Sequence, residues 1–370
     1  MNALGLVFSN IHDNNVPELT QDRTMGSIPF CGRYRLIDFA LSNLVNSGVT
    51  KVGLITKSNY QSLMDHVGSG KDWDLARRRG GLHILPPFGL KENVLYNTRL
   101  EALRGAKNFL ARSDEEYVVM TDCDNVCTLN FDKILQEHVA KNADVTLVYI
   151  KRDSAEVKDV QNKMVVELEE NGRVDEISFS PRTQGEINLY TNVCLLKRTL
   201  LQTLIADAFS HGFSHFGKDV LARNVNSLRI FAYEHKGYYV ALNSLQSYYS
   251  ESLKFLDRSV RDEIFRKVDV YTKVKDSAPT RYGANAVVKN SLIADGCVIE
   301  GTVENSIIFR GVKIGRGTVV KNSILMQGTI TGENVTLNAI VADKNVVVKD
   351  RRVLSGCETH PFYISKNIIV

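Results

Sequence analysis

The 370-residue sequence predicts an α/β domain with a mostly parallel, Rossmann-like sheet, followed by a left-handed parallel β-helix. Two observations predict this fold. Apolar runs alternate with amphipathic stretches from residue 1 to about 245, and a four-residue repeat recurs along residues 281–350. More than one domain is also expected from the length, because single cores stop growing at about 250 to 300 residues.

The alternation in the first part predicts right-handed βαβ units. The expected buried strands are residues 4–8, 52–55, 117–120 and 145–150, and the expected amphipathic helices include 37–47 and 131–140. Ligands bind beyond the carboxyl ends of the strands in sheets of this kind. The loops after Phe8 and Met120 are therefore the predicted location of a site.

Residues 246–280 are expected to join the two parts. An apolar stripe predicts one helix over 246–268, and residues 270–279 have the composition of an extended connector. The predicted division is an α/β domain at 1–245, a helix and linker at 246–280, and a repeat domain at 281–370.

The repeat consists of Asn, a small residue and two aliphatic residues, and it starts at Asn290, Asn305, Asn322 and Asn338. The starts are 15, 17 and 16 residues apart. Short aliphatic strands separated by Gly, Asn or Asp turns are typical of hexapeptide repeats, in which three strands form one coil and the coils stack. An antiparallel sandwich is the alternative, but the Asn-Gly turns of its hairpins are absent from 281–350.

Composition excludes several classes of protein. The 46 Lys and Arg residues nearly balance 42 Asp and Glu residues, and 44% of the residues are hydrophobic, as in ordinary globular proteins. With a net charge of +4 and no basic block longer than Arg77-Arg78-Arg79, the chain is not expected to bind nucleic acid. No run of about 18 apolar residues predicts a membrane helix.

The cytoplasm is the expected location. The first apolar run, residues 3–8, has no basic flank and is too short for a signal peptide. Six cysteines without paired spacing indicate reduced thiols. Cys123 and Cys127 have two interpretations, which are half of a metal site and buried structural thiols.

Residues 32–43 read GRYRLIDFALSN and are followed by Asn46-Ser47-Gly48. Further along the chain come His66-Val67-Gly68, Ile84-Leu85-Pro86-Pro87 and Phe216-Gly217-Lys218-Asp219. These motifs resemble the bacterial glucose-1-phosphate adenylyltransferase (ADP-glucose pyrophosphorylase) family over essentially the whole chain. The resemblance implies a nucleotidyltransferase domain of the GT-A-like type. Catalytic members join glucose 1-phosphate to the adenylyl group of ATP with Mg²⁺ and release pyrophosphate.

Departures from that family begin in the loop after the first strand. Catalytic members carry a Gly-rich turn that ends in Arg, whereas this chain has no glycine between Asn10 and Val16. Asn15 stands at the Arg position, and Asp13 adds a negative charge where a triphosphate would lie. Glycine is required in such a loop because the backbone approaches phosphate closely.

Further departures remove cations and a carboxylate. The resemblance places Met25 and Ser180 at positions of Lys in the family, and Ala241 at the position of a metal-binding Asp. The pocket-lining Gly-Thr-Ala-Asp-Ala segment appears as residues 97–101, NTRLE. Each lost charge-assisted phosphate contact removes an interaction stronger than a neutral hydrogen bond.

One catalytic carboxylate remains. Asp124 matches the metal-binding Asp of the family, and Asp122 lies two residues earlier. Both carboxylates could point at one cation, or both could be loop and helix-capping acids without a metal. Since Ala241 supplies no partner, the prediction is that the chain holds no metal.

The combined losses resemble the non-catalytic, GlgD-type subunits of the family. Loss of several such groups, at about 3 kcal/mol each, predicts little or no activity of the chain alone. The resemblance implies a catalytic GlgC-type partner in a homo- or heterotetramer for glycogen synthesis. No cofactor is expected for this chain, and Mg²⁺ belongs to the catalytic partner.

The resemblance also implies an effector site. Basic residues that bind anionic effectors in the family match Arg23 and Arg35, with Arg33 beside them, whereas Asp22 stands where the family is often basic. Arg suits sugar phosphates or nucleotides because its guanidinium is bidentate and permanently charged. The alternative is structural, with Arg33 and Arg35 paired to Asp38 or other acids.

Two other functions are compatible with parts of the sequence. One is an active sugar-1-phosphate nucleotidyltransferase with a reorganised phosphate loop, supported by Asp124 and the retained residues 216–219. The other is a hexapeptide-repeat acyltransferase. The repeats offer it no well-placed catalytic His, because His360 follows the last repeat, and it leaves the first domain unexplained.

Overall fold

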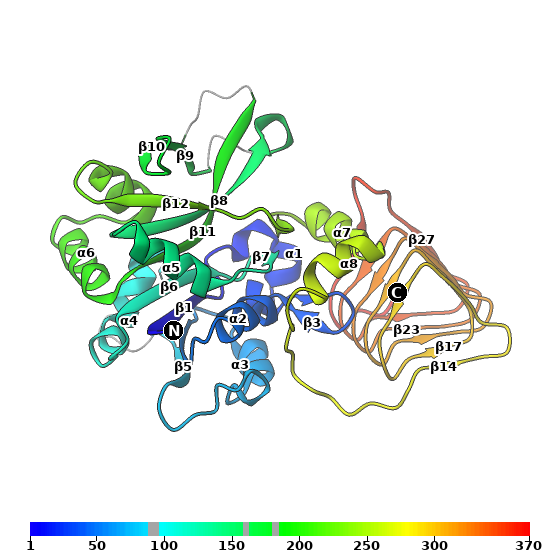
Figure 1. Cartoon of the computed structure of the whole chain (residues 1–370). Coiled ribbons are helices and arrows are strands. Elements are labelled where there is room, and N and C mark those ends of the chain that lie inside the picture. Colours follow the sequence, from blue (N-terminus) through cyan, green and yellow to red (C-terminus); the bar gives the residue numbers. More distant parts are fainter. Residues whose placement is uncertain (88–95, 158–162, 180–184) are drawn as a thin grey trace.

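The protein consists of an α/β domain and a β-helix, with two short helices between them (Figure 1). The computed structural model describes residues 1–87, 96–157, 163–179 and 185–370. The expected α/β domain and left-handed β-helix are confirmed. Within the described residues, no helix combines the length and apolar character needed to cross a membrane.

The α/β domain is built on a nine-stranded sheet in which four parallel strands lie side by side in the order β6-β1-β4-β5. These strands are β1 (Ala3–Phe8), β4 (Lys51–Ile55), β5 (Gly81–Leu85) and β6 (Tyr117–Asp122). β11 (Glu186–Lys197) adds antiparallel to β6. The remaining strands are β8 (Val145–Asp153), β9 (Val165–Leu168), β10 (Val174–Ser178) and β12 (Ile230–Glu234).

Helices cover both faces of this sheet, as its apolar strands require. Leu6 faces a core shared with α4 (Arg99–Ala111) and α6 (Arg198–Ser210). The next residue, Val7, faces a core shared with α2 (Leu36–Asn46) and α5 (Phe131–Ala140). The remaining helices of this domain are α1 (Pro17–Thr20) and α3 (Gln61–Val67).

Two small antiparallel sheets lie outside the main one. β7 (Asn125–Cys127) pairs with β13 (Tyr239–Ala241), and β2 (Pro29–Phe30) pairs with β3 (Tyr34–Arg35). The first of these brings the loop after β6 next to Ala241, because Ala241 pairs with Asn125.

The prediction of a single helix over 246–268 was wrong. Two helices occur, α7 (Leu245–Lys254) and α8 (Arg258–Phe265). Asp257 begins the second helix, and its side chain accepts a hydrogen bond from the Ser259 N–H, which satisfies a helix N-terminus that a continuous helix would lack.

Three parallel sheets form the β-helix, one on each side of its triangular coils (Figure 1). The first contains β14 (Arg281–Tyr282), β17 (Val298–Ile299), β20 (Lys313–Ile314), β23 (Ile330–Thr331) and β26 (Val347–Val348). The second contains β15 (Val287–Lys289), β18 (Thr302–Glu304), β21 (Val319–Lys321), β24 (Thr336–Asn338) and β27 (Val353–Ser355). The third contains β16 (Leu292–Ile293), β19 (Ile307–Ile308), β22 (Ile324–Leu325), β25 (Ile340–Ala342) and β28 (Phe362–Ile364).

The Asn of the repeat turns one corner of each coil. Asn290, Asn305 and Asn322 have φ values of 41°, 47° and 46°, in the left-handed region that Asn tolerates well. In the fourth coil this conformation belongs to Ala339, with φ of 52°. The sequence alignment that started the fourth repeat at Asn338 was therefore off by one residue, and Asn338 instead pairs with Lys321.

The two domains share one hydrophobic core, to which α7 and α8 also contribute. Phe30 and Phe39 from the first domain, Phe255 from the helices, and Ile324 and Val341 from the β-helix belong to it. The helices do not act as a flexible linker, since their apolar residues hold the two domains together.

A buried ion pair crosses the same interface. Arg23 Nη2 donates to both oxygens of the Asp343 carboxylate, at 2.7 and 2.8 Å. The Tyr363 hydroxyl donates to the same carboxylate at 2.9 Å. Arg23 and Asp343 are each 2% exposed. Removing one partner leaves an uncompensated buried charge, which is far more costly than breaking an exposed pair.

We expect Arg23→Met to lower the free energy of unfolding by about 3 to 5 kcal/mol. The matched control is Arg229→Met, because Arg229 makes a comparable 2.8 Å contact with Asp144 but is exposed, and its loss is expected to cost below about 1 kcal/mol. Chemical denaturation of both variants measures the difference. Equal losses in the two variants would contradict a role of the Arg23–Asp343 pair in holding the domains together.

Candidate functional site

Two carboxylates and a histidine meet at the carboxyl ends of β1 and β6. Asp122 ends β6, Asp124 follows in the next loop, and His12 comes from the loop after β1. His12 Nε2 lies 2.7 Å from Asp122 Oδ2 and 3.6 Å from Asp124 Oδ2. These loops are the two in which the sequence predicted a site.

Arg99, the first residue of α4, completes this cluster. Its Nη2 donates to Asp122 Oδ1 at 2.6 Å and to the Asn192 carbonyl at 2.7 Å, and its guanidinium lies 4.9 Å from the centre of the Phe8 ring. Thr98 holds the start of α4 in place through a reciprocal capping box with Glu101. The helix thus points a fixed cation at Asp122.

Charges within the cluster shift the protonation of its members. Burial disfavours the charged imidazolium, but the Asp124 charge and the hydrogen bond with Asp122 outweigh it and raise the pKa of His12 to about 9. Burial acts in the opposite direction on Asp122, yet Arg99 and His12 lower the pKa of that carboxyl. At neutral pH His12 and Arg99 are therefore both positively charged and contact the ionised carboxylate of Asp122.

The loop after β1 is closed on itself rather than open to phosphate. The Asp13 carboxylate accepts a 2.7 Å hydrogen bond from the Met25 N–H, and burial raises the pKa of Asp13 to about 7. The Met25 side chain, where the family has Lys, is buried in the core shared by the domains. Asn15, at the position of the family's Arg, lines a polar pocket with Glu18 and His360.

Asp124 and Ala241 lie side by side, as the resemblance implied. The Leu242 N–H donates to the Asp124 carbonyl at 2.8 Å, and both Asp124 and Ala241 line a cavity of about 720 Å³. Basic groups in the same cavity come from Arg152, Lys163 and Lys254. Ser180, which the resemblance places at the position of a sugar-phosphate Lys, lies outside the described residues.

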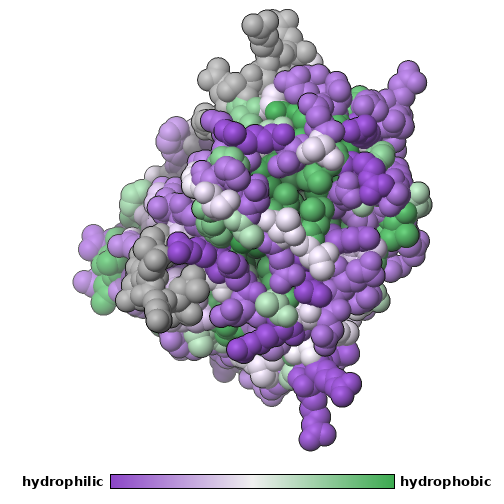
Figure 2. Space-filling model, turned by 90° about the vertical axis from the view of Figure 1, so that its left-hand side faces the viewer, coloured by the Kyte–Doolittle hydropathy of each residue, from purple (hydrophilic) through white to green (hydrophobic). Residues whose placement is uncertain are grey.

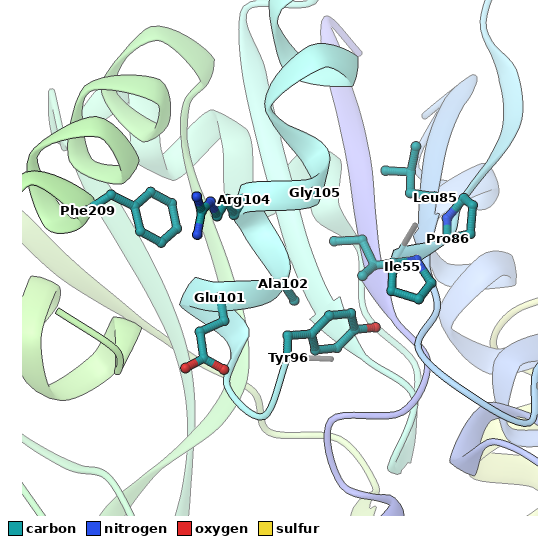
Figure 3. Close-up of a pocket in the computed structure, with 10 residues that line it drawn as sticks. Ile55, Leu85, Pro86, Tyr96, Glu101, Ala102, Arg104, Gly105 and Phe209 are labelled. Atoms are coloured by element: carbon teal, nitrogen blue, oxygen red, sulfur yellow. The ribbon is translucent and has the colours of Figure 1, made fainter. Parts of the chain in front are cut away.

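A smaller cavity of about 170 Å³ lies between the ends of β4 and β5 and one side of α4. Figure 3 shows Ile55, Leu85 and Tyr96 on one side of it and Phe209 on the other, with Glu101 and Arg104 from α4. The Tyr96 hydroxyl donates to Asn10 Oδ1 at 3.1 Å, which connects this wall to the loop after β1. Seen from the end of the α/β domain, apolar residues gather between polar ones near the middle of the surface (Figure 2).

A strongly basic pocket of about 380 Å³ lies between the two domains. Its described lining includes basic residues from both domains and from the segment that joins them, and it includes no acid: Arg33, Arg35, His66, Lys273, Lys275, Arg310 and Lys344. Of the three predicted effector residues, Arg33 and Arg35 line it. Arg23 does not, because its guanidinium is held by Asp343.

Arg35 does not form the predicted structural ion pair with Asp38. Its Nη1 donates to the Ser62 carbonyl at 2.6 Å and to the Ser62 hydroxyl at 3.0 Å. Asp38 Oδ1 contacts His66 Nε2 at 2.6 Å, and its other oxygen accepts from the Arg35 backbone N–H. In the part of the chain that the structure describes, neither Arg33 nor Arg35 has an ion pair with a carboxylate.

Lys344 also lines the basic pocket, and sequence reasoning missed it. Burial and the nearby charges of Arg35 and Arg23 lower the pKa of Lys344 to about 7, against the attraction of Asp343. The residues around Lys344 in the sequence do not indicate a binding site, because only the folded β-helix brings this lysine to the first domain.

The roles of His12 and Arg99 were also missed by sequence reasoning. The signal that could have found them is that both cations stand in segments whose family counterparts contain glycine or small residues. Cys123 and Cys127 are buried in an apolar core. The three-ligand cluster found among the described residues, His12, Asp122 and Asp124, contains neither cysteine, which favours the interpretation as structural thiols.

Comparison with known proteins agrees with this architecture. A family model described as nucleotidyl transferase matches residues 16–258, and one described as GlmU-like C-terminal hexapeptide matches residues 274–360. The chain is 30% identical over 371 residues to glucose-1-phosphate adenylyltransferase of Fervidobacterium nodosum, covering 96% of this chain and 85% of that protein. The chain belongs to the glucose-1-phosphate adenylyltransferase family.

Within this family, the chain is similar to proteins that carry another name. It is 32% identical over 367 residues to the glycogen biosynthesis protein GlgD of Bacillus subtilis, covering 99% of this chain and 96% of that protein. It is 37% identical over 323 residues to GlgD of Geobacillus stearothermophilus, covering 86% and 82%. These adenylyltransferase-family relatives support a role in glycogen biosynthesis.

The raised pKa of His12 predicts a stability difference that depends on pH. Because the folded-state pKa exceeds the unfolded value of about 6.5, the imidazolium stabilises the fold fully below that pH, and its contribution is lost as the pH rises through about 9. We expect the free energy of unfolding of wild type to exceed that of His12→Asn by about 2 kcal/mol at pH 7 and by much less at pH 10. Urea denaturation across this range measures the difference.

The control for this prediction is Asn15→Ala, since Asn15 lies in the same loop and its amide does not titrate. It should give a difference that does not change over the same pH range. A constant difference for His12→Asn as well would contradict the raised pKa. Comparing variants at each pH cancels the contribution of Lys344, which titrates in the same interval and does not interact with His12.

Proposed function

We propose that this chain is a regulatory, catalytically deficient subunit of glucose-1-phosphate adenylyltransferase in cytoplasmic glycogen biosynthesis. In this proposal it assembles with a catalytic, GlgC-type subunit and modulates the synthesis of ADP-glucose from ATP and glucose 1-phosphate. The chain itself requires no cofactor, and Mg²⁺ acts in the catalytic partner.

The proposal rests on the ion pairs and hydrogen bonds within the candidate site, which bind its charged groups to one another. Asp122 is paired with Arg99 and His12, and the Asp13 carboxylate is hydrogen-bonded to the Met25 N–H in the loop where a triphosphate would bind. A catalytic site requires backbone N–H groups and cations directed at the phosphates. Here these groups are directed at the protein itself.

Retention of residues 216–219 does not restore an active site. Asp219 accepts hydrogen bonds from the backbone N–H groups of Ser214 and His215, at 3.0 and 2.8 Å. These bonds lower the pKa of its carboxyl and stabilise the turn before η7 (Phe216–Leu221). The motif that favoured an active enzyme in the sequence is thus consistent with a structural role.

The last coil of the β-helix supports assembly with another subunit. The C-terminal tail covers part of it, since Val347 and Lys349 in and after β26 donate to Ile368 and Val370. Val353 on β27 remains 72% exposed, and Phe362 and Ile369 are also exposed. Exposed apolar side chains at an open sheet edge favour contact with a partner chain.

The basic pocket supports binding of an anionic effector such as a sugar phosphate or nucleotide. Arg33 and Arg35 belong to the first domain, whereas Arg310 and Lys344 belong to the β-helix. An anion bound between them would contact both domains. Such a ligand could therefore bias how the β-helix, and any partner on it, sits against the first domain.

Enzyme assays of the chain alone and with a catalytic subunit from the same genome test the proposed function. We expect the chain alone, given ATP, glucose 1-phosphate and Mg²⁺, to turn over at least about 10³-fold more slowly than the catalytic subunit, because more than one phosphate-stabilising group is absent. After co-expression we expect a complex with the mass of a tetramer and an altered kcat or KM.

Comparable turnover by the chain alone would overturn the catalytic deficiency. If light scattering detects no shared complex and the kinetics of the catalytic subunit stay unchanged, the regulatory role fails. Phe362→Ser, at an exposed position of the last coil, is expected to weaken assembly without changing the fold of the chain alone.

The lowered pKa of Lys344 predicts that anion binding depends on pH. The lysine is protonated below about pH 7, so we expect the affinity for inorganic sulfate to fall on the order of tenfold between pH 6 and 8.5, about the value of one charge-assisted hydrogen bond. Isothermal titration of wild type and Lys344→Arg measures this. The arginine stays charged, so the variant should lose most of the pH dependence.

The other basic groups that line this pocket are His66, Arg33, Arg35, Lys273, Lys275 and Arg310. The comparison with Lys344→Arg isolates the lysine, because these groups are the same in both proteins. An unchanged pH dependence in the variant would assign the effect to His66 instead and would contradict the prediction.

A further inference from the structure

We propose that the Arg99 guanidinium is an internal cation that replaces the divalent metal ion at the Asp122–Asp124 carboxylates, while His12 occupies the second oxygen of Asp122. The chain then binds no divalent cation at this position. The inference deepens the proposed function and rests on it for its biological meaning, but it concerns metal binding and can be tested without any activity.

The cluster has the composition of a metal site but not the accessible ligand atoms. Single ligand atoms of His12, Asp122 and Asp124 lie within 4.8 Å of one another, as three ligands of one ion would. However, both oxygens of Asp122 already contact a protein donor, Oδ1 the Arg99 guanidinium and Oδ2 the His12 ring. A hard divalent ion needs several free oxygen atoms, so these residues as arranged do not fit Mg²⁺.

Arg99 is held too firmly to move aside. Its side chain is 9% exposed, and its contacts include the Asn192 carbonyl and, at 3.3 Å, the Tyr190 hydroxyl. The backbone at Arg99 is fixed by the capped start of α4. An ion that displaced the guanidinium would leave a buried charge without its partner, which is strongly unfavourable. An ion that bound beside it would meet a permanent positive charge.

The position of Ala241 removes the second oxygen donor. Ala241 pairs with Asn125 across the β7–β13 ladder, and the neighbouring Leu242 N–H binds the Asp124 carbonyl. A carboxylate at position 241 would therefore stand next to Asp124 and face the same cavity. Arg99 and Ala241 both disfavour metal binding, because Arg99 supplies a cation and Ala241 offers no ligand atom.

The double variant Arg99→Met/Ala241→Asp tests the proposal by removing the cation and adding the carboxylate. Mn²⁺ is the probe, and electron paramagnetic resonance of free Mn²⁺ measures its binding to the full-length chain. We expect at least tenfold tighter binding than to wild type. The matched control is Arg99→Lys/Ala241→Asp, which keeps a cation and should show no such gain.

Assignment to the cluster requires a third comparison. Wild type and Asp122→Asn/Asp124→Asn should bind Mn²⁺ with the same weak affinity. A submillimolar wild-type site that is lost in this variant overturns the proposal, and so does equal Mn²⁺ affinity of the Met and Lys double variants. If the Met variant does not fold, Arg99→Gln/Ala241→Asp is used in its place against the Lys double variant, and removal of the cation should again tighten Mn²⁺ binding.

These outcomes are separate from those of the proposed function. A regulatory subunit with a genuine metal site would form the complex yet fail the Mn²⁺ experiment. A chain with an internal cation but no catalytic partner would show the reverse.

Discussion

The hydrophobic core shared by the two domains is the interaction on which the rest of the structure depends. It contains residues of the β-helix, of α7 and α8, and of the first domain, and Arg23, which pairs with Asp343, contacts its member Met326. The same core includes Val126 and Leu242, the neighbours of the Asp124 and Ala241 positions. The candidate site and the β-helix thus rest on one packed unit, and neither can shift far without the other, because protein interiors are close-packed.

The shared core connects the basic pocket to the candidate site. The pocket exists only where the two domains meet, so an anion bound there contacts both. The candidate site adjoins the shared core through Val126 and Leu242. An effector in the pocket, or a partner on the β-helix, would act by changing the contact between the two domains. The charged groups of the candidate site itself are paired with one another.

The cations of the candidate site differ from those that the family resemblance leads one to expect. The resemblance places Asn15 and Met25 at the positions of the phosphate-binding Arg and of one Lys, and the buried methionine contributes to the shared core. His12 and Arg99 supply cations that compensate Asp122 and Asp124. A net charge of +4 conceals this difference, because these cations are directed at the protein instead of at solvent or substrate.

The sequence by itself determined the two folds and the absence of glycine from the loop after β1. Apolar runs, the Asn-containing repeat and missing glycines are local patterns, and local patterns reflect burial and backbone conformation directly. Only the tertiary structure decided that Arg23 is a structural ion-pair partner, that Arg99 and His12 neutralise the carboxylates, and that Lys344 faces Arg35. Asp343 lies 320 residues from Arg23, and the pairing of such distant charges depends on how the domains pack, which no local pattern encodes.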